Sequence, residues 1–331
     1  MQKTTDSSEW RPTAALTTLH RRAQILAGIR EYFAAAEVLE VETPQLMRTA
    51  SPDPALQSFS VRSLAPGETS LSGFLQTSPE FAMKRLLAAG SGDIYQLCHA
   101  FRVEHPGRHH LAEFTLLEWY RIGFDHHRLM DEVESLVGAI LPAAKFVRRS
   151  YAEVFREGLQ LDPHCANTAD LAAAATAAGI ELGAASDDRS ILLDALFGAL
   201  FLRDCPRSQA LFVYDFPVEQ AAYARIERGP PSVAQRFELL IGGIEIANGY
   251  FEVTEYGEQV QRHEIENRRR EALGLPVIAV DQQFLSALRA GLPMCSGVAL
   301  GIDRLVLLAT DLDGVGQCVA FDPFGGISAD V

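Results

Sequence analysis

The sequence lacks an excess of basic residues and any long apolar segment. Its 331 residues include 29 Lys and Arg but 43 Asp and Glu, which gives a formal net charge of -14. This balance leaves no global basic field to attract nucleic acid phosphates or an anionic membrane surface. No segment offers the ~18 apolar residues of a membrane span, and the N-terminal stretch has no signal-peptide core. The sequence therefore predicts a soluble cytoplasmic protein that contacts no membrane.

Closely spaced cysteine pairs are also missing. A CxxC pair of the kind that opens a zinc or redox site does not occur, because the five cysteines are widely scattered: Cys98, Cys165, Cys205, Cys295 and Cys318. We expect reduced, mostly buried thiols.

The remaining composition is that of a folded globular protein. Apolar residues make up 48% and charged residues 22%, which excludes a disordered, collagen-like or coiled-coil chain. The length exceeds the ~250–300 residues at which a single core usually stops growing. One large domain over 1–331 with an insertion therefore competes with two domains.

Apolar periodicity predicts the first elements. Residues 24–38 place Ile25, Ile29 and Phe33 on one helical face, and the extended segment 39–46 follows. Residues 94–104 and 113–120 alternate as two strands around a loop with Pro106 and Gly107, which predicts a long antiparallel hairpin.

The later elements are predicted in the same way. The segment at about 142–205 is rich in alanine and leucine, so we interpret it as a helical insertion. Strands are expected at 237–246 and 250–253, followed by a charged helix at 258–273. Its Arg268-Arg269-Arg270 run is typical of a solvated helix face, with a nucleic-acid contact as the alternative. An apolar strand then passes through Gly297 and Gly301 into the last helix.

Two clusters have residue types suited to phosphate chemistry. Arg102 and Glu104 share a strand face, and Arg304 lies at the start of the last helix. A guanidinium can bind phosphate oxygens through two hydrogen bonds, and a carboxylate can accept from an adenine amino group. The alternative for Arg102 and Glu104 is a surface ion pair.

The second cluster is the segment GGIEIANGYFE at 242–252. Because Asn-Gly favours a tight turn, we expect Glu245 and Glu252 on adjoining strands, where two carboxylates suit a divalent cation that also takes phosphate oxygens. The alternative is two solvent-facing residues. The pairs His109-His110 and His126-His127 allow a transition-metal hypothesis, but no matching ligand set accompanies them.

Five ordered segments carry a family resemblance. LEVETPQL at 39–46, FRVEHPGRHHLAEFTLLEWY at 101–120 and GVALGIDRLVLL at 297–308 resemble motifs 1, 2 and 3 of class II aminoacyl-tRNA synthetases. TSPEFAMKRLL at 77–87 and GGIEIANGYFE narrow the likeness to the lysyl branch. The resemblance runs from about residue 20 to 325.

One part of that branch has no counterpart here. Lysyl-tRNA synthetases carry an anticodon-binding barrel before motif 1, whereas motif 1 begins here about two dozen residues into the chain. A lysyl-type core without the barrel is similar to the elongation factor P–lysine ligase family. Two details agree: EVTE at 252–255 replaces the common ELND, and Ala299 stands where lysyl-tRNA synthetases usually have glycine.

The resemblance implies roles for individual residues. Arg102 would clamp the α-phosphate, Glu104 would meet the adenine, and Arg304 would lie beneath the nucleotide. The implied nucleotide contacts are Arg102, Glu104, His110, Leu111, Phe114, Glu245, Ile246, Gly301 and Arg304. The implied amino-acid contacts are Ser78, Pro79, Glu80, Glu118, Tyr120, Glu252 and Ala299. Glu245 and Glu252 match magnesium ligands.

The resemblance also implies a fold and an activity. The expected fold is α+β, a single catalytic domain over 1–331 with the helical insertion at about 142–205. It consists of a mostly antiparallel sheet flanked by helices, in a homodimer paired through motif 1. The expected activity uses ATP and Mg2+ to activate (R)-β-lysine, or lysine, and to attach it to a lysine of elongation factor P, without stable tRNA binding. Two alternatives remain: a minimal synthetase that charges tRNA, and a non-catalytic regulatory paralogue.

Overall fold

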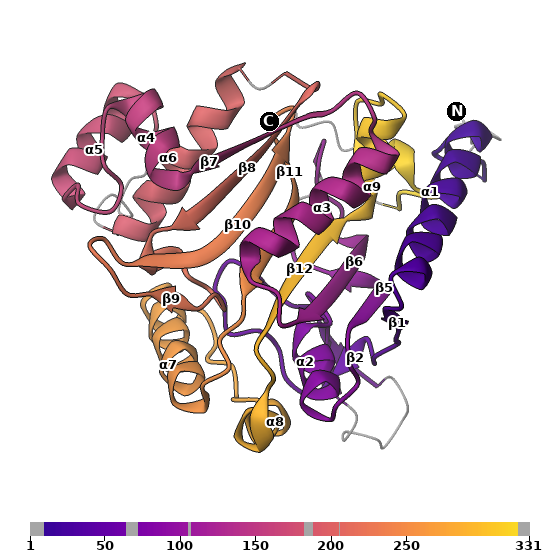
Figure 1. Ribbon diagram of the computed structural model, residues 1–331, viewed down its shortest axis with the longest axis horizontal. Helices are drawn as coiled ribbons and strands as arrows, with labels where there is room; N and C mark the ends of the chain where they lie inside the picture. Colours follow the sequence, from indigo (N-terminus) through magenta and orange to yellow (C-terminus); the bar gives the residue numbers. More distant parts are fainter. Residues whose placement is uncertain (1–9, 64–71, 105–106, 182–187, 205, 324–331) are drawn as a thin grey trace, which may run out of the picture.

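The computed structural model describes residues 10–63, 72–104, 107–181, 188–204 and 206–323 (Figure 1). Pro106 and Cys205, which the sequence interpretation used, lie outside the described residues. The chain folds as an α+β structure around one large, mostly antiparallel sheet, as predicted.

Within the described residues, the large sheet has nine strands. Its hydrogen-bonded order is β1 (Leu39–Glu40), β5 (Ile94–Phe101), β6 (Glu113–Ile122), β12 (Cys295–Gly301), β11 (Ile244–Phe251), β10 (Val233–Ile241), β8 (Gln209–Phe216) and β7 (Lys145–Ser150), and β9 (Ile226–Glu227) pairs with β10. Among the strands that the structure describes, only the outermost pairs, β1 with β5 and β7 with β8, are parallel. A second sheet joins β2 (Leu46–Met47), β4 (Ser72–Leu75) and β3 (Ser60–Arg62).

Three helices cover one face of the large sheet (Figure 1): α1 (Leu16–Ala35), α3 (His126–Ile140) and α9 (Ile302–Ala309). Phe33 of α1 stacks on Tyr95 with ring centroids 4.4 Å apart and meets the edge of Trp119 at 5.4 Å. These rings belong to the main core, which the short helix η3 (Val315–Cys318) helps to close. The predicted helix is therefore confirmed, although it begins at Leu16 rather than Gln24.

Another group of helices packs at one end of strands β5, β6 and β12. Helices α2 (Glu80–Ala88) and α8 (Gln282–Gly291) form an apolar cluster with Ile94, Tyr120 and Cys295. Helix α7 (Tyr256–Ala272) contacts α8, and the short η2 (Val218–Gln220) follows β8. Among the described residues, no helix is long and apolar enough to cross a membrane.

The segment expected to be a helical insertion packs against strands β8 and β10 in a second apolar cluster. It contains α4 (Tyr151–Leu159), α5 (Thr168–Ala177) and α6 (Arg189–Asp204), packed around Tyr151, Phe155 and Leu192. Its first element, β7, was not predicted and extends the large sheet. That the whole chain forms one domain with this insertion stays a prediction.

Three local predictions were wrong. The turn between β10 and β11 lies at Gly242-Gly243, both with positive φ, so Asn248-Gly249 is inside β11. Strand β5 ends at Phe101, so Arg102 and Glu104 follow it in a loop. Arg270 is 3% exposed and donates to the Pro276 carbonyl, so the arginine run is not wholly a solvated face.

The described cysteines are free thiols. Cys98, Cys295 and Cys318 are buried, as predicted, and Cys165 is exposed.

Gly249 gives a test of the strand assignment. A Cβ there would lie 2.5 Å from Phe237 Cε1 and 3.0 Å from Val298 Cβ, in the main core. We expect Gly249→Ala to lower the free energy of unfolding by ~1–3 kcal/mol through overpacking, measured by urea denaturation. Gly257→Ala is the matched control, because a Cβ on that residue of α7 meets nothing within 4 Å. Equal stability of the two variants would contradict this packing.

Candidate active site

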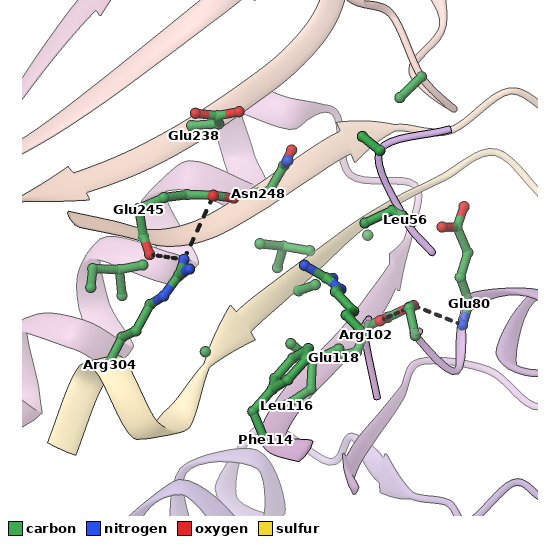
Figure 2. A pocket seen from close by; sticks show the side chains of 18 of the residues that line it. Leu56, Glu80, Arg102, Phe114, Leu116, Glu118, Glu238, Glu245, Asn248 and Arg304 are labelled. Carbon is green, nitrogen blue, oxygen red and sulfur yellow. Dashed lines mark hydrogen bonds and ion pairs between the residues drawn. The ribbon is translucent and has the colours of Figure 1, made fainter. Parts of the chain in front are cut away.

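A cavity of about 320 Å³ lies on the sheet face opposite α1 and α3. Residues 53–56 close one side of it, and strands β6, β12, β11 and β10 supply much of its wall (Figure 2). The predicted site residues that line it are Ser78, Glu80, Arg102, Glu104, His110, Leu111, Phe114, Glu118, Tyr120, Glu245, Ile246, Glu252, Ala299, Gly301 and Arg304. Pro79 lines a neighbouring cavity of about 50 Å³ that shares Ser78 and Glu80.

Small residues of β12 keep the floor of the cavity open. Gly297, Ala299 and Gly301 alternate with Val298 and Leu300, which are buried in the main core. A Cβ on Gly297 would lie 2.5 Å from Tyr120 Cδ1 and 2.7 Å from Glu252 Oε1. The strand therefore lets side chains from both neighbouring strands approach its backbone.

One end of the cavity is acidic. Glu118 is 2% exposed and accepts hydrogen bonds from Ser78 Oγ and Tyr120 Oη, each at 2.7 Å. Ser78 Oγ also accepts from the Glu80 backbone N–H at 3.1 Å, at the first turn of α2. Burial, and then the nearby Glu80 carboxylate, raise the pKa of Glu118 to about 7. This end suits a ligand that carries ammonium groups.

A buried lysine lies behind these carboxylates. Lys84 Nζ is 2.5 Å from Glu80 Oε1 and 2.6 Å from Glu252 Oε2. The side chains of Lys84 and Glu252 are each 1% exposed. Burial raises the pKa of Glu252, and the ammonium group of Lys84 opposes that rise.

Two arginines also line the cavity: Arg102 lies near Glu118, and Arg304 lies on the far side beside Glu245 (Figure 2). Arg102 Nη2 donates to the Thr77 carbonyl at 3.5 Å, and its guanidinium lies over the Phe114 ring at 5.0 Å. Its Nε is buried and has no hydrogen-bond partner among the described residues. An unpartnered guanidinium N–H in a cavity is suited to binding an anion.

Arg304 has a different environment at the start of α9. It donates to the carbonyls of His109 at 3.2 Å and Glu245 at 2.8 Å, and the Glu245 carboxylate is 3.6 Å away. These bonds link the last helix, the loop after β5 and strand β11. The arginine is therefore positioned by three separate segments of the chain.

The loop between β5 and β6 contributes Glu104, His110 and Leu111 to the lining of the cavity. His110 Nε2 lies 3.9 Å from Glu104 Oε2. Burial, and then the charge of Arg304, lower the pKa of His110. Arg102 and Glu104 do not form the surface ion pair considered as an alternative, because within the described part of the chain their side-chain polar contacts are with other residues.

The structural basis for a shared cation at Glu245 and Glu252 was wrong. Glu245 lies in β11 and Glu252 directly follows the last residue of that strand, so the two do not face each other across a turn. Glu245 has a 43% exposed side chain beside Arg304, so its carboxylate fits a cation carried by phosphates, whereas Glu252 is already paired with Lys84. Among the described residues, no group of three or more His, Cys, Asp or Glu side chains is arranged to hold a metal ion. Magnesium binding at these two residues stays a prediction.

The sequence interpretation missed several residues of the cavity. Arg236 and Glu238 of β10 form a buried ion pair there, and Arg236 Nε donates to Asn248 Oδ1 at 3.2 Å. Their i and i+2 spacing on one strand face was the available signal. Lys84, which lies behind the cavity, was also missed, and its signal was the i,i+4 spacing from Glu80 on a helix.

Comparison with known proteins places these residues in a family. The model of the tRNA synthetases class II (D, K and N) matches residues 6–323. A protein of Vibrio parahaemolyticus is 44% identical over 319 residues, and one of Erwinia tasmaniensis is 45% identical over 318. A protein of Vibrio cholerae is 45% identical over 320 residues. Each alignment covers 96% of this chain and 98% of the relative, and each relative is named elongation factor P–(R)-β-lysine ligase.

The raised pKa of Glu118 predicts a pH-dependent stability. Its ordinary carboxyl pKa of 4.5 applies to the unfolded chain, and about 7 to the folded protein. The folded state thus binds the proton more tightly, so the contribution of Glu118 to stability is present below about pH 4.5 and is lost as the pH rises through about 7.

We expect Glu118→Gln to raise the Tm of the ligand-free protein relative to the wild type, and the difference to be larger at about pH 9 than at about pH 5, because the amide does not ionise. Glu157→Gln, at a side chain that is 68% exposed, is the control for removing one surface charge. A Tm difference that does not vary with pH would contradict the assignment.

Proposed function

The chain belongs to the class II tRNA synthetases (D, K and N), among the elongation factor P–(R)-β-lysine ligases, and from this premise we propose that it activates (R)-β-lysine with ATP and transfers it to a lysine of elongation factor P. One observation carries the proposal beyond the family: a single cavity has an acidic end at Glu80, Glu118 and Glu252 and a cationic part at Arg102 and Arg304. A diamino acid with ATP requires both.

The first reaction joins the amino acid to AMP. The substrate carboxylate attacks the α-phosphorus, the bond to the pyrophosphate oxygen breaks, and an aminoacyl adenylate forms. Both reactants are negatively charged there, so the role of Arg102 is to bind α-phosphate oxygens through its unpartnered Nε and its Nη atoms. Phe114, which the Arg102 guanidinium overlies, would stack on the adenine.

The acidic end positions the amino acid. Glu118 and Glu80 would bind ammonium groups of the substrate, which places its carboxylate toward Arg102. Mg2+ would neutralise phosphate charge, and Glu245, the more exposed of the two predicted ligands, is suited to contact it.

The second reaction transfers the amino acid. The amine of a lysine in elongation factor P attacks the carbonyl carbon of the adenylate, an amide bond forms, and AMP leaves with the bonding electron pair. The reaction takes place where elongation factor P works, so we also propose a cytoplasmic location. A homodimer through the first motif is proposed with it; exposed Leu39 on edge strand β1 and exposed Leu46 support an apolar contact there.

Mass spectrometry tests the proposal directly. Elongation factor P incubated with the protein, ATP, Mg2+ and (R)-β-lysine should gain the mass of one β-lysyl group, and lysine should react less well. Charging of lysine tRNA in place of elongation factor P would support a minimal synthetase. Absence of any amino-acid-dependent ATP–pyrophosphate exchange would support the non-catalytic alternative.

Arg102 provides the sharpest single substitution. We expect Arg102→Ala to lower lysine-dependent ATP–pyrophosphate exchange by about a hundredfold or more, because a transition-state contact worth ~3 kcal/mol is lost. Arg108→Ala is the matched control, since Arg108 lies in the same loop with a 61% exposed side chain and binds Asp313 outside the cavity. Undiminished exchange by the Arg102 variant would overturn its assignment to the α-phosphate.

Ala299 is the proposed selectivity element. Its Cβ faces the cavity between register partners Glu118 and Asn248, where a methyl group fills room beside an α-amino group. We expect Ala299→Gly to improve kcat/KM for α-lysine by roughly 10–200-fold, with a smaller effect for (R)-β-lysine. Ala247→Gly, at a buried position in the main core, should leave the isomer ratio unchanged. An unchanged ratio in the Ala299 variant would mean that Ala299 only packs against its neighbours.

A further inference from the structure

Lys84 is a fully buried cation that does not itself line the cavity. It lies one helical turn after Glu80 on α2, and its Nζ bridges Glu80 and Glu252 at 2.5 and 2.6 Å. The Tyr223 ring lies 5.1 Å from the same Nζ. Both carboxylates line the cavity. Lys84 therefore reaches the cavity only through the two side chains that it binds.

The net charge at the acidic end of the cavity depends on Lys84. Glu80, Glu118 and Glu252 all border the cavity, and Lys84 supplies one buried positive charge beside them. Fully ionised, the four groups have a surplus of two negative charges, which equals the two ammonium groups of a diamino acid. Without Lys84 the surplus would be three, in a site where burial already favours protonated carboxyl groups.

We infer that Lys84 is the positioning residue of the amine-binding end: it opposes protonation of the buried Glu252 and holds Glu252 and Glu80 aimed at the cavity, so that the site presents a matched charge to a diamino acid. This inference rests on the proposed function. Lys84 makes no contact with the substrate, and it acts by fixing the charge and orientation of groups that do.

The electrostatic surroundings of Lys84 include other titratable groups. Those around it, besides Glu80 on its own helix, are Glu252, Glu118, Tyr120, Tyr223 and Cys295. Burial raises the pKa of both Tyr120 and Cys295, so these two stay neutral near neutral pH. Glu252 and Glu118 are therefore the carboxyl groups whose ionisation depends on Lys84.

Lys84→Met removes the charge and keeps an unbranched side chain of similar length. The pKa of Glu252 should rise, and each unit of rise lowers its ionised fraction about tenfold at a pH below the pKa. We expect the KM for the amino acid to increase by about tenfold or more, with the KM for ATP unchanged. The acid limb of kcat/KM for the amino acid should move to higher pH by about one unit or more, because more alkaline conditions are then needed to ionise the carboxylates.

Two further variants separate positioning from folding. Lys84→Arg retains the positive charge, so its acid limb should stay near that of the wild type even if the larger group lowers Tm. Arg121→Met breaks a comparable part-buried pair with Asp93 and Glu132 outside the cavity, and should lower Tm without moving the pH profile. A Lys84→Met variant that loses Tm and kcat but keeps the wild-type pH profile and amino-acid KM would overturn the inference.

An infrared measurement is independent of catalysis. The carbonyl band of protonated carboxyl groups should be stronger in Lys84→Met than in the wild type near neutral pH, and Lys84→Arg should resemble the wild type. If the wild type shows no amino-acid-dependent exchange, the proposed function fails, while this comparison still decides whether Lys84 sets the ionisation. Equal bands in all three proteins would overturn that role.

Discussion

The two-faced character of strand β12 is the constraint on which the site depends. This strand lies in the middle of the sheet, paired on one side with β6 and on the other with β11. Val298 and Leu300 bury their side chains in the main core, while Gly297, Ala299 and Gly301 border the cavity. A larger residue at Gly297 would meet Tyr120 and Glu252, so the cavity exists because this face of the strand is nearly bare.

Charge is separated along that floor. Carboxylates from β6, from α2 and from the end of β11 gather at one end, Arg102 lies next to them, and Arg304 lies farther along beside Glu245 (Figure 2). In a cavity of low dielectric such charges act more strongly than they would in water, so a ligand with ammonium groups at one end and phosphates at the other has one favoured orientation. The net charge of -14 does not prevent nucleotide binding, because the arginines act locally.

The sequence could predict the blocks but not all of their connections. Helix α1, the β5–β6 hairpin and the passage from β12 into α9 follow from apolar periodicity. All but one of the site residues assigned from the family motifs line the cavity. Asn248-Gly249 misled the prediction because an Asn-Gly pair favours a turn locally, whereas Gly242-Gly243 forms it and Gly249 packs against Phe237. Strand β7 was missed because its pairing with β8 joins segments about sixty residues apart, which no local pattern reveals.

Residues that support the site are the hardest to find in a sequence, because their partners lie far away along the chain. Arg22 of α1 donates to Asp303 at 2.6 Å and to Thr115 Oγ1 at 2.7 Å, and Asp303 accepts from the Thr115 backbone N–H at 2.7 Å. This buried network fixes the start of α9 against β6, and Arg304 is the next residue. Lys84 has the equivalent place at the acidic end. In both cases an ion pair fixes the position of a side chain in the cavity. Positioning explains such pairs better than net stability does, because the cost of desolvating the two charges offsets most of their attraction.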